Sequence, residues 1–519
     1  MSAMTEPRTI DPDALTMGAV RDGALRGRPV TVLGFARSGI ALARFLADAG
    51  ARVTVYDGRL KDELTGAIEA LEGRDVALAL GPDIDPAATW AEAALVTTSP
   101  SINPDYPTTE PRLREALRTL VAARAAGDPT APALVSEPDL FLRLCPAPTV
   151  GVTGTKGKTT TASLAAALLA ADPSHPAVLG GNIGVPIVER LPELTPDHRV
   201  VYELSELQLP TLSRGTTVAA YTNVTEDHID RHGSLEAYRR VKRRLAELVD
   251  PAGALVLNAD DPVVAAYAEL GTAPVVPYRV DEPTPGGLGV VDGWIVAAGV
   301  QRLPMAGGGA ATTEPGGRVL PIEELALPGR HNVSNVLAAV AVALLFGVAP
   351  DAIRRAAAAF TGVEHRLETV AVVDEVRFVN DSQGTQPDAV AAALRAFPAP
   401  LVLIAGGRDK GIDLAPLAPV VAERAAAAVL IGESGPTLEA LFHEAGLAHT
   451  ERAVSLEAAV RQADALAREA LADRPGPATV LLSPAAASFD MFEDYAARGR
   501  AFKQAVAELA ASRAAGGDR

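Results

Sequence analysis

Short apolar runs alternate with longer segments of helical periodicity along most of the chain. The runs fall at 30–33, 52–56, 94–98, 149–153, 200–204, 218–221, 401–404, 429–431 and 480–482, with another near Phe378. Most end in a glycine-containing or polar loop, and helical patterns separate many of them. This alternation predicts an α/β protein whose largely parallel sheets are flanked by helices, and it groups into three such units.

With 519 residues the chain is too long for a single hydrophobic core, and we expect two to four domains. Residues 283–318 depart from the alternating pattern because they are rich in Gly and Pro, and we expect an elaborated loop with a hairpin-like segment at 293–296. The long apolar stretch at 333–349 is interrupted by Ser334 and Asn335 and is too short for a membrane span, so it predicts a buried helix.

Residues 149–161 read T-V-G-V-T-G-T-K-G-K-T-T-T, and a helix-forming segment follows. A strand, a glycine loop and a helix start in this order form an anion cradle, because backbone N–H groups converge on the ligand and the helix end adds positive charge. Lys158 would reach the β- and γ-phosphates, and the Thr159 hydroxyl would bind Mg²⁺.

The phosphate loop departs from the strict Walker pattern, since Val152 stands where that pattern has its first glycine. The match is to the shorter form G-T-x-G-K-T, which begins at Gly154. A glycine-rich structural turn that happens to contain a lysine is the alternative. The order of strand, loop and helix favours a nucleoside triphosphate site.

Residues 30–57 predict a β-α-β unit whose loop, Gly34 to Gly39, resembles a dinucleotide fingerprint. Ala36 replaces the middle glycine, and Asp57 ends the second strand where a ribose hydroxyl would be held. A dinucleotide or the head group of another nucleotide would fit. Ser101 lies in a loop after the next strand, at the sheet edge where ligands bind.

Two polar residues at strand ends are candidate metal ligands. Glu203 lies in an apolar strand, where an unpaired acid is costly, and His228 follows the run 218–221 at a strand-to-loop junction. Each could be a satisfied core polar group. Their common position beside a phosphate loop favours a magnesium site.

The segment 234–249 predicts an amphipathic helix. At about 100° per residue, one face is apolar and the other carries Arg239, Arg240, Arg243 and Arg244. Lys242 falls on the apolar face. A buried lysine has a lowered pKa and reacts more readily with carbon dioxide, so Lys242 could form a carbamate that binds a second Mg²⁺, or it could extend to the rim. Helix geometry leaves both outcomes open.

The net charge of −17 argues against a general nucleic-acid surface. Cys145 is the only cysteine, which excludes an intramolecular disulfide and suits a reducing cytoplasm. The N-terminal residues lack the apolar run of a signal peptide. We therefore expect a cytoplasmic protein without nucleic-acid or membrane partners. We also expect a monomer, on which these features do not bear.

Ten motifs taken together resemble the Mur ligases, in family order from about residue 30 to 500. They are G-T-K-G-K-T-T, G-G-N-I-G, E-L-S-E-L-Q-L, N-V-T-E-D-H-I-D-R, Y-R-R-V-K, H-N-V-S-N, E-H-R-L-E, N-D-S-Q-G-T, G-G-R-D-K-G and L-S-P-A-A-A-S-F-D. The resemblance implies a UDP-binding Rossmann-like domain (1–136), a central ATP-binding phosphate-loop domain (137–362) and a Rossmann-like glutamate-binding domain (363–519).

Within the family, the best match is to the member that adds D-glutamate to UDP-N-acetylmuramoyl-L-alanine in peptidoglycan synthesis. The resemblance implies that ATP phosphorylates the alanyl carboxylate and that the amine of glutamate attacks the acyl phosphate. Two Mg²⁺ ions and lysines would offset the repulsion between the γ-phosphate and the carboxylate.

The resemblance also implies roles for individual residues. Lys158, His228, Lys242 and Asn182 match catalytic positions, and Thr159, Glu203, His228 and carbamylated Lys242 match metal ligands. ATP contacts match Gly154, Thr155, Lys156, Gly157, Lys158, Thr159, Thr160, Asn332, Asn335, Arg366 and Asp381. The UDP pocket matches Arg37, Ser38, Asp57, Arg59 and Ser101, and the glutamate pocket matches Thr385, Lys410, Ser488 and Tyr495.

Several positions depart from the pattern of the D-glutamate-adding member. Gln383 replaces a lysine, Gln386 an asparagine, Ser101 a glycine and Tyr495 a phenylalanine, and Glu206 stands where serine is common. Because Gln383 removes a positive charge near the incoming amino acid, a sibling that adds L-glutamate is an alternative. A folylpolyglutamate-type ligase and an NAD-binding or regulatory protein are the others.

Overall fold

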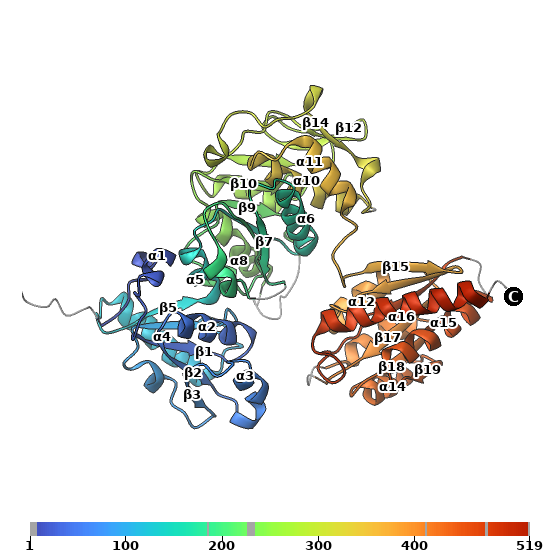
Figure 1. Cartoon of the computed structure of the whole chain (residues 1–519), viewed down its shortest axis with the longest axis horizontal. Helices are drawn as coiled ribbons and strands as arrows, with labels where there is room; N and C mark the ends of the chain where they lie inside the picture. The colour runs from blue at the N-terminus through green and yellow to red at the C-terminus, as the bar shows by residue number, and fades with distance from the viewer. Residues whose placement is uncertain are drawn as a thin grey trace, which may run out of the picture. The chain divides into compact units, whose positions relative to one another are not determined.

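The computed structural model describes residues 8–183, 186–225, 234–327, 329–409, 413–472 and 476–516. Three α/β domains are built on sheets of five, nine and six strands (Figure 1). The first two sheets belong to one compact unit, Met1–Thr361, and the third to a second unit, Gly362–Arg519. The predicted fold class is confirmed, and the domain limits at 136/137 and 362/363 stay predictions.

The first sheet is parallel throughout and has the strand order β3-β2-β1-β4-β5. Its strands are β1 (Pro29–Leu33), β2 (Arg52–Asp57), β3 (Val76–Leu80), β4 (Leu95–Thr98) and β5 (Ala133–Ser136), and its helices are α1 (Met17–Arg21), α2 (Arg37–Asp48), α3 (Thr65–Glu69) and α4 (Pro111–Ala125). Since β1 lies between β2 and β4, the loops that follow these three strands meet at one edge of the sheet.

The second sheet has the order β14-β13-β12-β11-β10-β9-β6-β8-β7. Its strands are β6 (Thr149–Thr153), β7 (Ala177–Gly181), β8 (Arg199–Glu203), β9 (Val218–Tyr221), β10 (Ala254–Asn258), β11 (Val275–Tyr278), β12 (Leu288–Val291), β13 (Trp294–Ala297) and β14 (Arg318–Pro321). β6, which leads into the phosphate loop, pairs in parallel with β8 and β9. Glu203 and the phosphate loop therefore lie at the ends of adjacent strands.

Helices cover both faces of the second sheet. α6 (Lys158–Ala170) and α10 (Arg330–Leu345) pack into one apolar cluster, and α5 (Glu137–Leu144) and α8 (Leu235–Leu248) pack into another. Every residue of α10 from Val336 to Leu345 is buried, which confirms the predicted buried helix. α9 (Pro262–Ala265) and α11 (Pro350–Ala359) complete the helices of this unit among the described residues.

The expectation of an elaborated loop at 283–318 is wrong in part. β12 and β13 form an antiparallel hairpin across Asp292 and Gly293, and β12 extends the central sheet beside β11. β14 then pairs with β13. Buried apolar side chains on alternate positions, Leu288 and Ile295 among them, join the same cluster as α10, so burial stabilises the hairpin despite its glycine-rich surroundings.

The third sheet has the order β15-β16-β20-β17-β18-β19. Its strands are β15 (Glu368–Val373), β16 (Val376–Asn380), β17 (Leu401–Gly406), β18 (Ala427–Ile431), β19 (Thr450–Arg452) and β20 (Ala478–Leu482); its helices are α12 (Pro387–Ala396), α13 (Ala418–Arg424), α14 (Gly435–Glu444), α15 (Leu456–Ala472) and α16 (Tyr495–Gly516).

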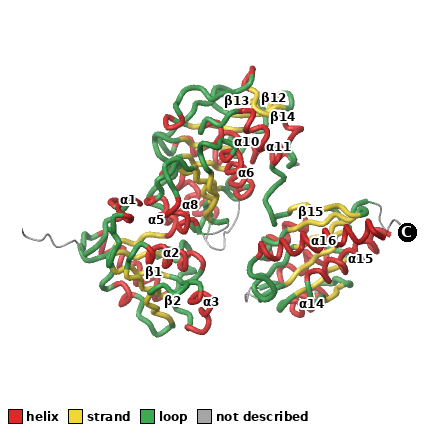
Figure 2. Tube along the Cα trace, viewed as in Figure 1, coloured by secondary structure: helices red, strands yellow, loops and turns green. Residues whose placement is uncertain are grey.

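Helices cover both faces of the third sheet as well (Figure 2). Alternate residues of β17 point to opposite faces, so that Val402 packs with α15 and α16 and Leu403 packs with α12, α13 and α14. β16, β20 and β17 are neighbours, which brings together the three loops predicted to carry ligand contacts in this domain.

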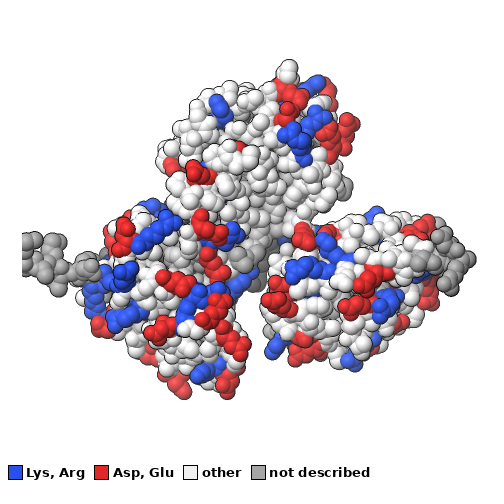
Figure 3. Space-filling view, in the orientation of Figure 1, with Lys and Arg blue, Asp and Glu red and all other residues white. Residues whose placement is uncertain are grey.

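Acidic and basic side chains are interspersed on the face drawn in Figure 3, as the mixed composition predicts. Within the described ranges, no helix combines the length and the apolar character that a membrane span requires.

Candidate nucleotide and ligation site

The phosphate loop joins β6 to the start of α6, as predicted. Gly157 adopts a left-handed conformation with φ +84° immediately before Lys158, the first residue of α6, and Gly154 has φ +150°. Residues with a side chain rarely adopt these conformations. The two glycines therefore allow the chain to turn from the sheet edge into the helix, whose first N–H groups face the loop.

Close packing is a second reason for these glycines. A Cβ atom at Gly154 would overlap the Thr222 hydroxyl, and a Cβ atom at Gly157 would overlap the side-chain amide of Asn335. Asn335 in turn accepts from the Thr161 hydroxyl at 3.3 Å and donates to the side-chain oxygen of Asn332 at 3.3 Å. Asn335, which is predicted to contact ATP, thus lies against the loop from α10, and Asn332, which is also predicted to contact ATP, is bonded to it.

Thr222 and Asn223 form hydrogen bonds with the other side of the phosphate loop. The Asn223 side chain accepts from the Lys156 N–H at 2.9 Å and donates to the Lys156 carbonyl at 2.9 Å, and its own carbonyl accepts from the Thr155 N–H at 2.7 Å. The Thr222 hydroxyl donates to the Lys156 carbonyl at 2.6 Å. Neither residue was predicted to contact the phosphate loop, although both follow an apolar strand at the ligand-binding edge.

Two lysines hold the backbone of the loop. The Lys158 ammonium donates to the Thr155 carbonyl at 2.8 Å, and the Lys242 ammonium donates to the Gly154 carbonyl at 2.9 Å. Lys242 has no exposed surface and lies 5.5 Å from the centre of the Tyr238 ring. Its predicted position on the buried face of α8 is confirmed, and both lysine side chains contact carbonyls of the loop.

Glu203 ends β8 beside the phosphate-loop strand, in register with Val152. Its carboxylate is 1% exposed, and one oxygen accepts from the Asn182 side chain at 3.0 Å. The other oxygen is buried and has no hydrogen-bond partner among the residues that the structure describes. Because an unpaired buried carboxylate oxygen is costly, this atom suits a cation.

The remaining predicted metal ligands are less completely defined. Thr159 is buried in the first turn of α6, and His228 lies outside the described residues. Over the described ranges, no group of three or more His, Cys, Asp or Glu side chains is arranged to hold a metal ion. Among the described residues, the predicted oxygen donors beside the phosphate loop are the unpaired Glu203 oxygen and the Thr159 hydroxyl.

The predicted UDP residues meet at the edge of the first sheet. The Asp57 carboxylate accepts a hydrogen bond from the Phe35 N–H at 2.8 Å. It also forms a bidentate ion pair with the Arg59 guanidinium group, with N···O distances of 2.8 and 3.0 Å. Although burial opposes ionisation, the hydrogen bonds from Arg59 and Phe35 hold the pKa of Asp57 below its usual value. Arg37 and Ser38 begin α2 at the same edge, and Ser101 lies after β4, with its hydroxyl 3.1 Å from that of Ser99.

The predicted residues of the second unit gather around the ends of β16 and β20. Asp381 accepts from the Ser483 hydroxyl at 2.7 Å and from the Leu367 N–H at 3.2 Å, next to Arg366 in the chain. Burial raises the pKa of Asp381 to about 6 in spite of the Ser483 hydrogen bond.

The predicted glutamate residues belong to the same region of the second unit. Thr385 follows Asp381 in one loop, Ser488 lies in the loop after β20, and Tyr495 begins α16. Lys410 lies outside the described residues.

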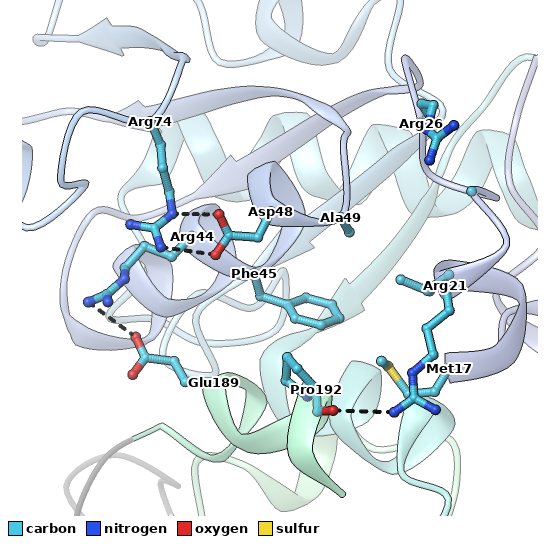
Figure 4. A pocket seen from close by; sticks show the side chains of 12 residues that line it. Met17, Arg21, Arg26, Arg44, Phe45, Asp48, Ala49, Arg74, Glu189 and Pro192 are labelled. Atoms are coloured by element: carbon cyan, nitrogen blue, oxygen red, sulfur yellow. Dashed lines mark hydrogen bonds and ion pairs between the residues drawn. The ribbon is translucent and has the colours of Figure 1, made fainter.

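A cavity of about 460 Å³ lies elsewhere in the first unit, among α1, α2 and the residues near Pro192 (Figure 4). Its arginines are largely engaged: Arg74 pairs with Asp48 at 2.8 Å, and Arg44 lies 3.7 Å from Glu189. None of the predicted site residues lines this cavity. It is separate from the phosphate loop.

The sequence matches two family models and several known proteins. The model of the Mur ligase middle domain matches residues 152–343, and that of the Mur ligase glutamate ligase domain matches residues 365–486. A UDP-N-acetylmuramoylalanine--D-glutamate ligase from Symbiobacterium thermophilum is 40% identical over 481 residues, which cover 92% of this chain and 97% of the relative. The chain belongs to the Mur ligase family.

A second relative with the same printed name, from Roseiflexus sp. strain RS-1, is 38% identical over 502 residues and covers 93% of this chain and 99% of its own. The similarity spans all three sheets of this Mur ligase. Membership of the Mur ligase family sets aside the alternative of an NAD-binding or regulatory protein.

We predict that Gly157→Ala destabilises the Mur ligase and weakens ATP binding by at least tenfold. The new Cβ would meet Asn335 in addition to the strain of a positive φ, which by itself costs roughly 1 kcal/mol. Gly286→Ala is the matched control, since Gly286 has φ +79° and nothing within 4 Å of an added Cβ. Thermal unfolding and ATP titration are measured for both variants. If the two substitutions lower the unfolding temperature and the ATP affinity equally, the packing of Asn335 against Gly157 has no role.

Proposed function

We propose that this Mur ligase uses ATP to join D-glutamate to the alanyl carboxylate of UDP-N-acetylmuramoyl-L-alanine, in peptidoglycan precursor synthesis. The observation that carries the proposal is the 40% and 38% identity, over more than nine-tenths of each chain, to two relatives named for this reaction. The phosphate loop, the two lysines and the buried Glu203 provide the chemistry that such a ligation needs.

The reaction has to turn a carboxylate into an electrophile. An oxygen of the alanyl carboxylate attacks the γ-phosphorus of ATP, ADP leaves, and an acyl phosphate forms. The amine of D-glutamate then attacks the acyl carbon and loses a proton as inorganic phosphate leaves with its bonding electrons. The first step brings two anions together, so the site must supply positive charge at their meeting point.

The loop from Gly154 to Thr160 is proposed to hold the ATP phosphates through the N–H groups at its α6 end and the Lys158 ammonium, since the Thr155 and Lys156 N–H groups donate to Asn223. Thr159 and the free oxygen of Glu203 are proposed to hold Mg²⁺, which would neutralise phosphate charge when it is bound. Asn182 orients Glu203 through the 3.0 Å hydrogen bond and lies beside the position of the transferred phosphate in this proposal.

Lys242 is proposed to act as a carbamate. Its neutral amine would add carbon dioxide, with formation of an N–C bond and loss of a proton, and the product would be an anionic oxygen ligand for a second Mg²⁺. Complete burial favours the neutral amine that this addition requires. The carbamate nitrogen keeps one N–H, which is sufficient to retain the bond to the Gly154 carbonyl.

The first sheet is proposed to bind the UDP group, with Arg37, Ser38, Asp57, Arg59 and Ser101 as contacts. In the second unit, Arg366 and Asp381 are proposed to contact ATP. Thr385, Lys410, Ser488 and Tyr495 are proposed to contact glutamate. The fixed Asp57–Arg59 pair is the feature of the first sheet that favours a nucleotide head group over a folate substrate.

The substrate assignment predicts phosphate release that requires both UDP-N-acetylmuramoyl-L-alanine and D-glutamate. Omission of either compound should reduce the rate to background, because the amine is needed to release phosphate from the acyl intermediate. A phosphate-release assay with each glutamate enantiomer provides the measurement. Turnover with L-glutamate alone would assign the enzyme to the L-adding sibling, and turnover only with a folate acceptor would assign it to the folylpolyglutamate class.

For the carbamate, we predict that Lys242→Ala lowers kcat by roughly 10²–10³-fold, the effect of removing one charge stabiliser of the transition state. Millimolar acetate should restore part of the activity, since its carboxylate fits the space of the missing group. Arg240→Ala, on the exposed face of the same helix, is the control and should retain activity. Full activity of unrescued Lys242→Ala would refute the role.

A further inference from the structure

The cavity drawn in Figure 4 has an apolar floor. Its volume of about 460 Å³ lies within the range of about 300–1,000 Å³ that is typical of small-molecule sites. Met17 and Val20 of α1 and Phe45 of α2 line it, and each of the three is only 6% exposed. Pro192, from the short helix η4 (Ile187–Glu193), lies beside them. An apolar group placed on this floor would therefore be removed from water.

Four arginines line the same cavity, and carboxylates neutralise two of them. Arg74 pairs with Asp48 at 2.8 Å and with Glu72 at 3.0 Å. Arg44 lies 3.2 Å from Glu72 and 3.7 Å from Glu189. Three carboxylates thus surround these two arginines, and this part of the cavity does not need an anionic ligand to balance its charge.

The other two arginines, Arg21 and Arg26, contact no carboxylate among the residues that the structure describes. Arg21 donates to the Pro192 carbonyl at 3.3 Å, and the side chain of Arg26 makes no hydrogen bond or ion pair with a described residue. Both lie on one side of the Phe45 ring, and the ion pairs of the neutralised arginines lie on its other side (Figure 4). One side of the cavity therefore carries two positive charges that no acidic side chain balances by contact.

The chemistry of this side of the cavity indicates a phosphate. Guanidinium groups bind phosphate oxygens through several N–H donors at once, and Arg21 keeps further donors beyond the one that Pro192 accepts. A phosphate monoester carries close to two negative charges at pH 7, which matches two arginines, whereas a carboxylate carries one. Because the adjoining floor is apolar, the group attached to the phosphate should be apolar as well.

The walls of the cavity belong to segments that lead to predicted ligand contacts. α2 begins with Arg37 and Ser38, which are predicted to contact UDP, and η4 follows Asn182 in the chain. α2 and η4 also pack against each other. A ligand held by α1, α2 and η4 together would bind only while these segments keep this arrangement, so its binding would stabilise that arrangement.

We propose that this cavity binds a phosphate monoester with an apolar group, the phosphate between Arg21 and Arg26 and the apolar group on the floor of Met17, Val20 and Phe45. None of the predicted site residues is among the residues that line the cavity. The inference therefore names a second ligand site and does not rest on the proposed function.

The test uses 1-naphthyl phosphate as the probe, with 1-naphthol and inorganic phosphate as its two halves. The unmodified full-length protein is titrated by calorimetry in saturating ADP, Mg²⁺ and UDP, which are added to occupy the phosphate loop and the predicted UDP contacts. We expect the probe to bind about tenfold more tightly than either half, or better, because the floor and the guanidinium groups both contribute.

Two substitutions remove the charges one at a time. Arg21→Met and Arg26→Met should each raise the Kd of 1-naphthyl phosphate about tenfold, the effect of losing one charge-assisted hydrogen bond. Arg118→Met is the matched control, because Arg118 also donates to a backbone carbonyl, that of Pro104 at 3.0 Å, and does not line the cavity. It should leave the Kd within about twofold.

A third substitution tests the place of the apolar group. Ala49 lines the cavity at the end of α2, so the ring of Ala49→Phe would occupy the space of the naphthyl group and should abolish binding of the probe. Thermal unfolding establishes that each variant is folded. If Ala49→Phe does not fold, the two arginine variants decide.

An unchanged Kd in both arginine variants would overturn the inference, as would binding of the probe no tighter than that of inorganic phosphate. An equal loss of affinity in Arg118→Met would attribute binding to net charge and would overturn it too, as would full binding by folded Ala49→Phe. Absence of turnover with D-glutamate would refute the proposed function and leave these binding results unaffected.

Discussion

Repulsion between anions is the constraint on which this structure depends. In the proposed reaction a terminal phosphate must meet a carboxylate, inside a protein whose own net charge is −17. In that reaction the backbone N–H groups at the start of α6, the Lys158 ammonium and bound Mg²⁺ would offset the repulsion locally. Lys242 contacts the Gly154 carbonyl, so that the loop is held in place before a ligand arrives.

Strand order places the other groups around this charge. Because β6 lies between β8 and β9, Glu203 comes to one side of the phosphate loop and Thr222 and Asn223 come to the other. Asn335 reaches the same loop from α10. The second unit repeats the arrangement at the ends of β16, β20 and β17. Neighbouring parallel strands thus bring together each set of predicted ligand contacts.

Much of the fold and part of the candidate site could be predicted from the sequence, because the periodicity of apolar residues indicates local secondary structure. The strand positions, the phosphate loop and the burial of Lys242 follow from patterns within fewer than twenty residues. The roles of Thr222 and Asn223 could not be predicted, since they depend on which strands are neighbours and on hydrogen bonds between distant segments. The place of the hairpin at 288–297 in the central sheet could not be predicted, because the surrounding glycines and prolines indicate a loop. The alternate burial of its apolar residues depends on packing against α10, which is distant in sequence.

Transfer of the γ-phosphate to the alanyl carboxylate is the central claim, and isotope transfer tests it most directly. UDP-N-acetylmuramoyl-L-alanine labelled with ¹⁸O in the alanyl carboxylate is turned over with ATP and D-glutamate, and the released phosphate is examined by ³¹P NMR. Phosphoryl transfer to the carboxylate predicts one ¹⁸O atom in each phosphate from fully labelled substrate. Unlabelled phosphate formed at the rate of ligation would contradict it.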